Sequence, residues 1–299
     1  MSASSRFRLF KFPVKNQLHR FTRSKFGSFL FFAILISGGL FSVLPLVYCI
    51  TTSFKPLDEL LIFPPTLFTV KRPTIANYTA IPDLLSGLSV PITRYAFNSI
   101  FVSIIGTFLS VIISAMAAFV LSKTEMKFNK LIFTVVQFSL LFNAYTLSVP
   151  QYIVYSKIGI INTYLAYIVP AAASSMGVFL MKQYMDGYVP YALIEAAHID
   201  GAGWIGIFTR IVLPIVRPCV LTLVMFSFLG IWNSVPSGTI FSESLKTLPT
   251  VMSTIAAGGL ARSGSSMATS VILMIFPIAV YLISQGSIKE TMGSAGIKG

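Results

Sequence analysis

Residues 195–201 read Glu-Ala-Ala-His-Ile-Asp-Gly, and residues 211–214 read Ile-Val-Leu-Pro. This stretch connects two apolar segments that are each long enough to cross a membrane as a helix. Pro190 suits the first position of a helix, because its missing N–H would have no partner there. Gly201 suits the left-handed conformation that commonly ends a helix. We therefore predict a short helix at the membrane surface, a glycine stop, and an amphipathic helix at 205–216 that returns to the membrane.

One face of the short helix combines Leu193, Ala196, Ala197 and Asp200, which follow i, i+3, i+4 and i+7 spacing. The alanines on this face allow another protein surface to approach closely. The alternative is an amphipathic helix that rests on lipid headgroups, but such helices usually carry Trp, Phe and Leu opposite Lys or Arg. This helix carries alanines and two acids, so the sequence favours a protein contact.

The composition predicts a membrane protein, with 55% hydrophobic residues, 10% charged residues and a mean hydropathy of +0.81. The alternation typical of a β-barrel is absent, and a helix needs about 20 apolar residues to cross a bilayer. We therefore predict an all-α membrane protein with six transmembrane helices. Pro150 and Pro170 interrupt the third and fourth spans, which is tolerated where neighbouring groups satisfy the freed carbonyls. The predicted spans are 26–50, 94–121, 131–150, 164–181, 218–236 and 267–285.

The basic residues predict the orientation. With the N-terminus inside the cell, the cytoplasmic segments hold most of the 22 Lys and Arg residues, namely seven in 1–25, three in 122–130, three in 182–217 and two in 286–299. This asymmetry follows the positive-inside rule. The net charge of +13 therefore implies contact with anionic membrane lipid, at roughly 1 kcal/mol per basic residue, and no motif supports nucleic-acid binding. The predicted parts are a basic cytoplasmic tail (1–25), a six-helix transmembrane domain (26–285) with a cytoplasmic loop (182–217), and a cytoplasmic C-terminal tail (286–299).

Three features resemble a known family. Residues 195–214 fill every fixed position of E-A-A-x-x-x-G-x9-I-x-L-P, which resembles the signature loop of ABC-importer permeases. Segments 53–56 and 73–78 in the first outer loop are similar to segments of carbohydrate-type permeases. The ending Gly296-Ile297-Lys298-Gly299 is similar to that of the maltose-type inner permease subunit. Over nearly its whole length, the chain thus resembles the smaller permease subunit of a carbohydrate importer of the oligosaccharide or polysaccharide-fragment branch.

This resemblance implies a type I ABC-importer permease fold, in which the cytoplasmic loop carries a coupling helix. It implies a location in the bacterial cytoplasmic (inner) membrane. The implied partners are a homologous larger permease subunit, a dimer of ATP-binding subunits and an extracytoplasmic solute-binding protein. ATP and Mg²⁺ would belong to the ATPase, so no cofactor or metal is expected in this chain, which would be a transport subunit rather than an enzyme.

The resemblance also assigns roles to residues of the loop. The helix 191–201 would dock in a cleft of the ATPase, and closure of the ATPase dimer would rock the spans from inward- to outward-facing. Glu195 is expected to make a charged contact, the alanines to pack closely, and Gly201 to set the angle of the helix. The residues assigned to the ATPase contact are Glu195, Ala196, Ala197, Asp200, Gly201, Leu213 and Pro214, together with Gly296, Lys298 and Gly299 of the tail.

The chain carries no energy source of its own. It has no G-x-x-x-x-G-K-[ST] phosphate loop. An ion-driven transporter normally buries Asp, Glu or His in a span, whereas the nine acids here fall in loops or at span ends and both histidines fall in cytoplasmic segments. A separate ATPase is therefore the favoured energy source, and the alternatives are an ion-coupled secondary transporter and a membrane scaffold without a transport role. The acids are Asp58, Glu59, Asp83, Glu125, Asp186, Glu195, Asp200, Glu243 and Glu290.

Five residues in the third and fifth spans have the chemistry of a sugar path, since sugars are bound by aromatic rings, amides and hydroxyls. The alternative for each residue is a hydrogen bond between helices, worth about 0.6 kcal/mol on average, and it is favoured for any single residue. By the resemblance, the larger subunit holds most of the sugar, and the acid that often follows Trp-Asn in the family is Ser234 here. The candidates are Gln137, Asn143, Tyr145, Trp232 and Asn233.

Two outer loops complete the prediction. The prolines of loop 51–93 suggest an extended, irregular path over the outer surface. The resemblance implies that loop 237–266 enters the solute-binding protein, and its small residues 256–259 would suit a narrow cleft. An ordinary solvent-exposed loop is the alternative in both cases.

Overall fold

A computed structural model describes residues 25–63, 66–87, 89–142, 144–236 and 238–295. All regular elements in these ranges are helices, which confirms the predicted all-α class. The chain divides into two units, residues 1–47 and 48–299. Of the predicted tails, residues 1–24 and 296–299 lie outside the described ranges.

The first unit contains most of helix α1 (Lys25–Ser53). The helix continues through Pro45, and its 29 residues correspond to a length of about 44 Å. This exceeds the hydrocarbon core of a bilayer, which is roughly 30 Å thick. Residues 26–53 have the length and hydropathy of a membrane span, in agreement with the first predicted span.

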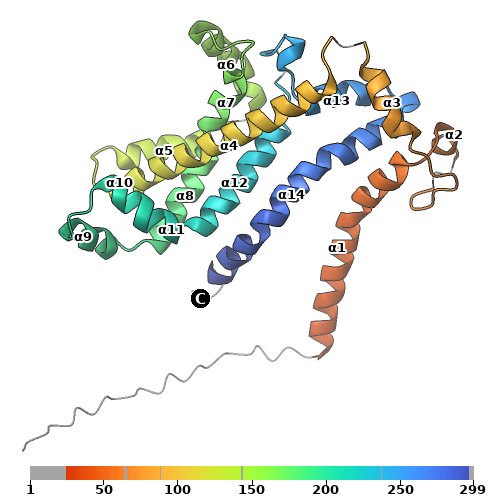
Figure 1. Cartoon of the computed structure of the whole chain (residues 1–299). Helices are drawn as coiled ribbons and strands as arrows, with labels where there is room; N and C mark the ends of the chain where they lie inside the picture. Colours follow the sequence, from red (N-terminus) through yellow and green to blue (C-terminus); the bar gives the residue numbers. More distant parts are fainter. Residues whose placement is uncertain (1–24, 64–65, 88, 143, 237, 296–299) are drawn as a thin grey trace, which may run out of the picture. The chain divides into compact units, whose positions relative to one another are not determined.

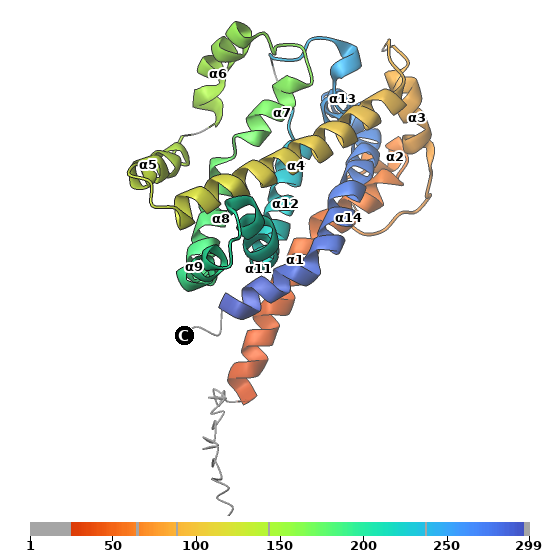
Figure 2. The ribbon, with the colours of Figure 1, turned by 60° about the vertical axis from the view of Figure 1, so that its left-hand side comes forward.

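The second unit is built around α4 (Ile92–Lys123), which contacts α7, α8 and α12. Figures 1 and 2 show α4 running through the unit beside these helices. Helix α14 contacts α12, α13 and α3. The remaining elements of the unit are α2 (Leu57–Leu60), α3 (Ala76–Leu85), α5 (Asn129–Ser139), α6 (Ala144–Ile158), α7 (Leu165–Ala172), α8 (Ser175–Tyr188), α9 (Tyr191–Ile199), α10 (Trp204–Ile207), η1 (Phe208–Val212), α11 (Leu213–Ile215), α12 (Arg217–Trp232), η2 (Glu243–Leu245), α13 (Leu248–Ala256), η3 (Leu260–Arg262) and α14 (Ser263–Ala295).

Small residues let the neighbours of α4 approach it closely, as is common where helices pack in membranes. Ala115 of α4 is fully buried. A Cβ atom on Gly177 of α8 would lie only 2.4 Å from Ser114 Oγ of α4. A Cβ atom on Gly106 of α4 would lie 3.0 Å from Ile231 Cδ1 of α12. Larger residues at these glycines would push α8 and α12 away from α4.

The helices that are long and apolar enough to span a membrane correspond to four of the six predicted spans, and a bent pair of helices corresponds to a fifth. Four helices in the described part of the chain have the required length and hydropathy, and a fifth span results if Trp204–Ile215 and Arg217–Trp232, which meet at 82°, count as one. The fourth predicted span is longer than expected and covers Leu165–Tyr188. Pro170 lies inside α7, and the break falls at Ser174, whose hydroxyl caps α8.

The third predicted span, 131–150, is not a single helix. Helices α5 and α6 are separated by residues 140–143. The N–H groups of Leu140 and Leu141 bond to carbonyls three residues back, which is the tighter pattern often found at the end of a helix. Pro150 lies inside α6. The prediction that Pro150 interrupts this span was therefore wrong, because the break comes before it.

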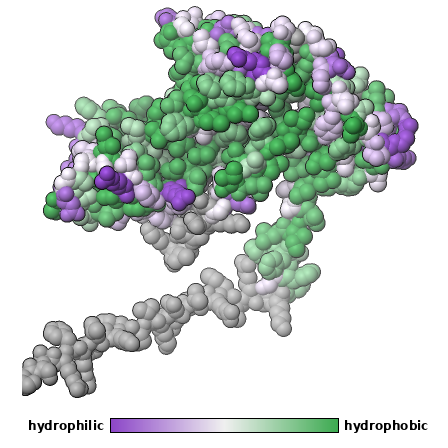
Figure 3. All heavy atoms as spheres, in the orientation of Figure 1, coloured by the Kyte–Doolittle hydropathy of each residue, from purple (hydrophilic) through white to green (hydrophobic). Residues whose placement is uncertain are grey.

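The surface of the second unit changes character along its length. In Figure 3, hydrophobic residues cover the middle of this face, and hydrophilic residues gather toward the ends that carry α9 and α2. Large apolar side chains such as Phe108 and Phe138 are 61% and 60% exposed. Exposed apolar area of this extent marks a surface that meets lipid or another protein.

The first outer loop is ordered by contacts between the two segments that carry the family resemblance. Asn77 Nδ2 donates hydrogen bonds of 2.8 Å to the carbonyls of Ser53 and Lys55, and the Tyr78 hydroxyl lies 2.8 Å from Ser53 Oγ. The rings of Phe54 and Tyr78 lie 5.4 Å apart. The predicted irregular path is confirmed for the described residues between α2 and α3, which contain no helix or strand, and is wrong where α2 and α3 form. Side-chain bonds to the backbone hold this loop together.

The second outer loop is packed over most of its length. Val251 and Ile255 of α13 are 1% exposed and belong to a core shared with α3 and α14. Asn98 of α4 donates hydrogen bonds to the carbonyls of Ser244 (2.8 Å) and Lys246 (2.9 Å). Residues 256–259, at the end of α13, stay exposed.

The bonds of Asn77 give a first prediction. Asn77→Ala would remove two hydrogen bonds and leave two carbonyls without this donor, so we expect a loss of stability of about 1–3 kcal/mol. Asn233→Ala is the matched control, because Asn233 is exposed and, among the described residues, its side chain bonds only to the carbonyl of Leu229 in α12. We expect a change of about 0.5 kcal/mol or less for this control. Thermal unfolding of the purified protein in detergent measures both, and equal midpoints for the two variants would contradict the role of Asn77.

Candidate functional site: helix α9 and a cavity between helices

The residues at the two ends of helix α9, Pro190 and Gly201, explain where the helix begins and ends. Pro190 precedes its first residue in an extended conformation (φ −65°, ψ 143°), one position earlier than predicted. Gly201 has φ +79°, which confirms the predicted left-handed stop. The N–H of Gly201 bonds to the carbonyl of His198 (3.0 Å), and the N–H of Ala202 bonds to that of Ala197 (2.9 Å). These two bonds form a Schellman motif, which satisfies carbonyls that a helix end otherwise leaves free.

The two sides of α9 have different surroundings. Ile194 (3% exposed) and Ala197 (6% exposed) lie in a core shared with α4, α8 and α12. Glu195, Ala196 and Asp200 are exposed. The predicted contact face is therefore corrected at Ala197, which packs inside its own chain and is not available to another protein.

Apolar side chains surround the exposed acids. Ile199 is 86% exposed and Leu193 is 39% exposed on α9, and Ile205 is 80% exposed on α10. Trp204, at the start of α10, is 47% exposed and packs edge-on against the His198 ring, with centroids 4.4 Å apart. The outward surface of this region therefore combines two carboxylates with exposed apolar groups. Figure 1 shows α9 and α10 at the end of the second unit opposite α3.

A buried lysine joins α9 to the end of α4. Lys123 is 4% exposed, and its Nζ donates a 2.6 Å hydrogen bond to the carbonyl of Val189 and lies 4.9 Å from the ring centroid of Tyr191. The Tyr191 hydroxyl donates to the carbonyl of Ser122 (2.8 Å), and the Ser122 hydroxyl donates to Asp186 (2.5 Å). Sequence reasoning missed this cluster, because a lysine at the end of an apolar helix suggests only a solvated, positive-inside charge.

The segment between α10 and α12 contains the second half of the signature loop. The predicted helix at 205–216 is present as Trp204–Ile215, with a π turn at Phe208–Val212. A π turn contains an extra residue relative to an α turn and often lies at a functional site. Leu213 is half-buried against the core under α9, and Pro214 is exposed.

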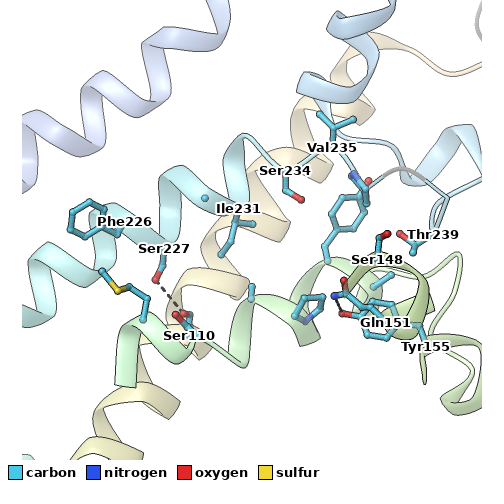
Figure 4. A pocket seen from close by; sticks show the side chains of 18 of the residues that line it. Ser110, Ser148, Gln151, Tyr155, Phe226, Ser227, Ile231, Ser234, Val235 and Thr239 are labelled. Carbon is cyan, nitrogen blue, oxygen red and sulfur yellow. Dashed lines mark hydrogen bonds between the residues drawn. The ribbon is translucent and has the colours of Figure 1, made fainter. Parts of the chain in front are cut away.

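A cavity of about 620 Å³ lies among α4, α6, α7, α8, α12 and the segment that follows α12. Its volume is within the usual range of ligand sites, about 300–1,000 Å³. Figure 4 shows Ser110 of α4 and Ser227 of α12 joined by a hydrogen bond at one side of the cavity, with oxygens 3.2 Å apart. Gln151 Nε2 donates a hydrogen bond to the Tyr155 hydroxyl on the other side of the cavity.

The five predicted sugar-path residues do not line this cavity in the part of the chain that the structure describes. Gln137 is exposed on α5, and Asn233 is exposed at the end of α12. Trp232 is 2% exposed and packs between other rings. Asn143 and the side chain of Tyr145 lie outside the described residues.

The residues that do line the cavity carry a signal that was missed. Ser148, Gln151 and Tyr155 follow i, i+3 and i+7 spacing on α6, which places them on one side of that helix. Ser227 lies on α12, and Ser234 follows just after the end of α12. The third predicted span ended at residue 150, so Ser148 fell inside the span and Gln151 and Tyr155 fell outside it. Their common side of α6 was therefore not recognised.

No protein-family model matches the sequence. The chain is 28% identical over 277 residues to the sulfoquinovosyl glycerol transport system permease protein SmoH of Agrobacterium fabrum. The alignment covers 91% of this chain and 93% of that protein. It is 27% identical over 286 residues to the inner membrane ABC transporter permease protein YcjP of Escherichia coli, covering 93% and 98%. It is 29% identical over 266 residues to the arabinooligosaccharides transport system permease protein AraQ of Halalkalibacterium halodurans, covering 86% and 92%.

The fold also matches a solved structure. A chain of a bacterial ABC transporter involved in the import of the acidic polysaccharide alginate superposes with a TM-score of 0.73 at 18% identity, covering 89% of this chain and 99% of that one. This match concerns the fold alone. Together with relatives that align along almost the whole sequence, it confirms the resemblance predicted from the signature loop and removes the secondary-transporter and scaffold alternatives. The chain belongs to the permease subunits of ABC importers.

Proposed function

We propose that this permease subunit takes part in ATP-driven uptake of carbohydrate, in particular of oligosaccharides, across the bacterial cytoplasmic membrane. The names of relatives such as the arabinooligosaccharide permease support a sugar substrate. The surplus of basic residues in 1–25 and in the segments after the second and fourth spans supports a cytoplasmic location for both termini.

The proposed partners are a homologous larger permease, a dimer of ATP-binding subunits that holds ATP and Mg²⁺, and an extracytoplasmic solute-binding protein. The exposed apolar residues of α5 and α6 support a contact with the second permease or with lipid. The exposed turn at 256–259, held at the end of a buried helix, supports the proposed contact with the solute-binding protein.

The observation that carries the proposal is the two-sided environment of α9. Its inner side is fixed in the core by Ile194 and Ala197, whereas Glu195, Ala196 and Asp200 are exposed. A helix held in this way moves as one body with the transmembrane helices that it contacts. A push on its exposed side, delivered when the ATPase dimer closes, would therefore move α4 and α8 and change which side of the membrane the bundle opens to.

Individual residues would have distinct roles in this coupling. Glu195 would meet a basic group of the ATPase, and Ala196 would allow close approach. Gly201 would set the angle between α9 and α10, and Leu213 and Pro214 would hold the return into the membrane. We propose the tail residues Gly296, Lys298 and Gly299 as a further ATPase contact, by resemblance alone.

ATP hydrolysis by the complete complex, reconstituted with its solute-binding protein, tests the proposed substrate class. We expect hydrolysis to rise when oligosaccharides recognised by the binding protein are added. A panel of gluco-, galacto-, xylo- and arabino-oligosaccharides that leaves hydrolysis at its basal rate would contradict a role in carbohydrate uptake.

Substitutions in α9 test the coupling surface. Glu195→Lys would place like charges at the ATPase contact, and Gly201→Asp would force a side chain into a backbone conformation with φ +79°. We expect both variants to insert in the membrane and to lose about tenfold or more of their uptake. Glu195→Lys loses an interfacial charge pair, which costs about 2 kcal/mol or more, and Gly201→Asp changes the angle between α9 and α10. Glu125→Lys, an exposed acid in the neighbouring cytoplasmic loop, is the control and should transport normally. Normal uptake by both α9 variants would remove the assignment.

The anchor at Lys123 gives a separate prediction. Lys123→Met would leave the carbonyl of Val189 without its donor, so the start of α9 would separate more easily from α4. We expect hydrogen exchange of the α9 amides to become about tenfold faster, which corresponds to about 1.4 kcal/mol, and substrate-stimulated ATP hydrolysis to fall. Lys127→Met changes an exposed lysine nearby and should alter neither measurement. Unchanged exchange in the Lys123 variant would show that the bond does not hold α9.

A further inference from the structure

The cavity among α4, α6, α7, α8 and α12 is lined without any charged side chain. The described residues around it are apolar, hydroxyl-bearing or amide-bearing, and none is Asp, Glu, Lys, Arg or His. Its polar groups are clustered, with Ser110 and Ser227 on one side and Gln151, Tyr155 and Thr239 on the other (Figure 4). The lining therefore offers hydrogen bonds and ring faces but no counter-ion.

The polar groups retain hydrogen-bonding capacity toward a ligand. Gln151 uses one N–H on the Tyr155 hydroxyl, and an amide has a second N–H and a carbonyl oxygen. The Tyr155 hydroxyl can then donate its own hydrogen. In the Ser110–Ser227 pair one hydroxyl donates to the other, so the accepting hydroxyl still has a hydrogen to donate. These groups match the hydroxyls of a sugar, which both donate and accept.

The same lining is unsuited to an acidic sugar. A carboxylate that enters a cavity lined largely by apolar groups loses part of its hydration, which costs free energy unless a cation or a set of donors compensates. No cation lines the described part of this cavity. Membership in the family does not tell whether the substrate is neutral or acidic, because its members and fold relatives include an arabinooligosaccharide permease and an importer of the acidic polysaccharide alginate.

We propose that this cavity contacts the transported carbohydrate through Gln151, Tyr155 and Ser227, and that it selects neutral oligosaccharides over acidic ones. The proposal rests on the proposed function in carbohydrate uptake. It adds to the expectation, drawn from the maltose-type resemblance, that the larger permease subunit holds most of the sugar. The ring of Tyr155, which is 6% exposed, is held by α6 at one side of the cavity and would bound the space for a sugar ring.

Matched sugars test the selectivity in the complete complex with its solute-binding protein. The panel contains neutral oligosaccharides, galacturonic-acid oligomers, and the same oligomers after reduction of their carboxylates to primary alcohols. Uptake and stimulated ATP hydrolysis are measured for each. We expect neutral members to be transported and acidic oligomers to be transported at least about tenfold less well, as a desolvation cost of more than about 1.4 kcal/mol requires. Preferred uptake of the acidic oligomers would overturn the selectivity, whereas no response to any sugar would contradict the proposed function itself.

Cavity variants test the contact with the best neutral sugar. Gln151→Leu keeps the size of the side chain and removes its hydrogen bonds, and we expect the sugar concentration at half-maximal uptake to rise about tenfold. Tyr155→Phe removes one hydroxyl while keeping the ring, so it gives a second readout if Gln151→Leu assembles poorly. Gln183→Leu makes the same change at an exposed position of α8 and should leave uptake unchanged. If Gln151→Leu and Tyr155→Phe both behave like this control, the cavity does not contact the sugar.

Discussion

The end of the second unit that carries α9 depends on the contacts of one buried ammonium group, that of Lys123. A lysine that is 4% exposed requires bonded partners, because an unpaired buried charge is among the most costly groups in a fold. The carbonyl of Val189 and the ring of Tyr191 supply them. Since Val189 follows α8 and Tyr191 begins α9, this requirement fixes the ends of α4 and α8 and the start of α9 in one arrangement. The position of the exposed side of α9 is therefore set by a buried contact on its other side.

Features that follow local rules could be predicted from the sequence. The stop at Gly201 needs only a residue that tolerates positive φ. The apolar runs of α1, α4 and α14 are long enough to be identified as membrane spans from the sequence. The assignment of Ala197 failed because Ala196 and Ala197 are adjacent on a helix. Their common spacing with Leu193 and Asp200 could not tell which of the two alanines would meet the core. Only the packing of α9 on α4 and α8 decides this.

The cavity could be predicted less well, for two physical reasons. Trp232 and Asn233 were chosen by their chemistry, but the ring of Trp232 packs against Phe228 and Phe276, where hydrophobic burial outweighs any use as a ligand contact. Five of the residues that line the cavity are serines, which also occur at ordinary helix contacts in membranes. Whether Ser148 lines a cavity depends on where the chain breaks between α5 and α6. No Gly or Pro within residues 140–143 marks that break in the sequence.

The π turn at Phe208–Val212 gives a physical meaning to the fixed distance between Gly201 and Leu213-Pro214. Each residue of an α-helix advances the chain by about 100° around the helix axis. The extra residue of the π turn therefore sets how the preceding segment is rotated about the helix axis relative to α12. This segment includes the acid-bearing side of α9. An insertion or deletion in this loop would change more than the length of the loop, because it would turn Glu195 to a different direction around the helix axis.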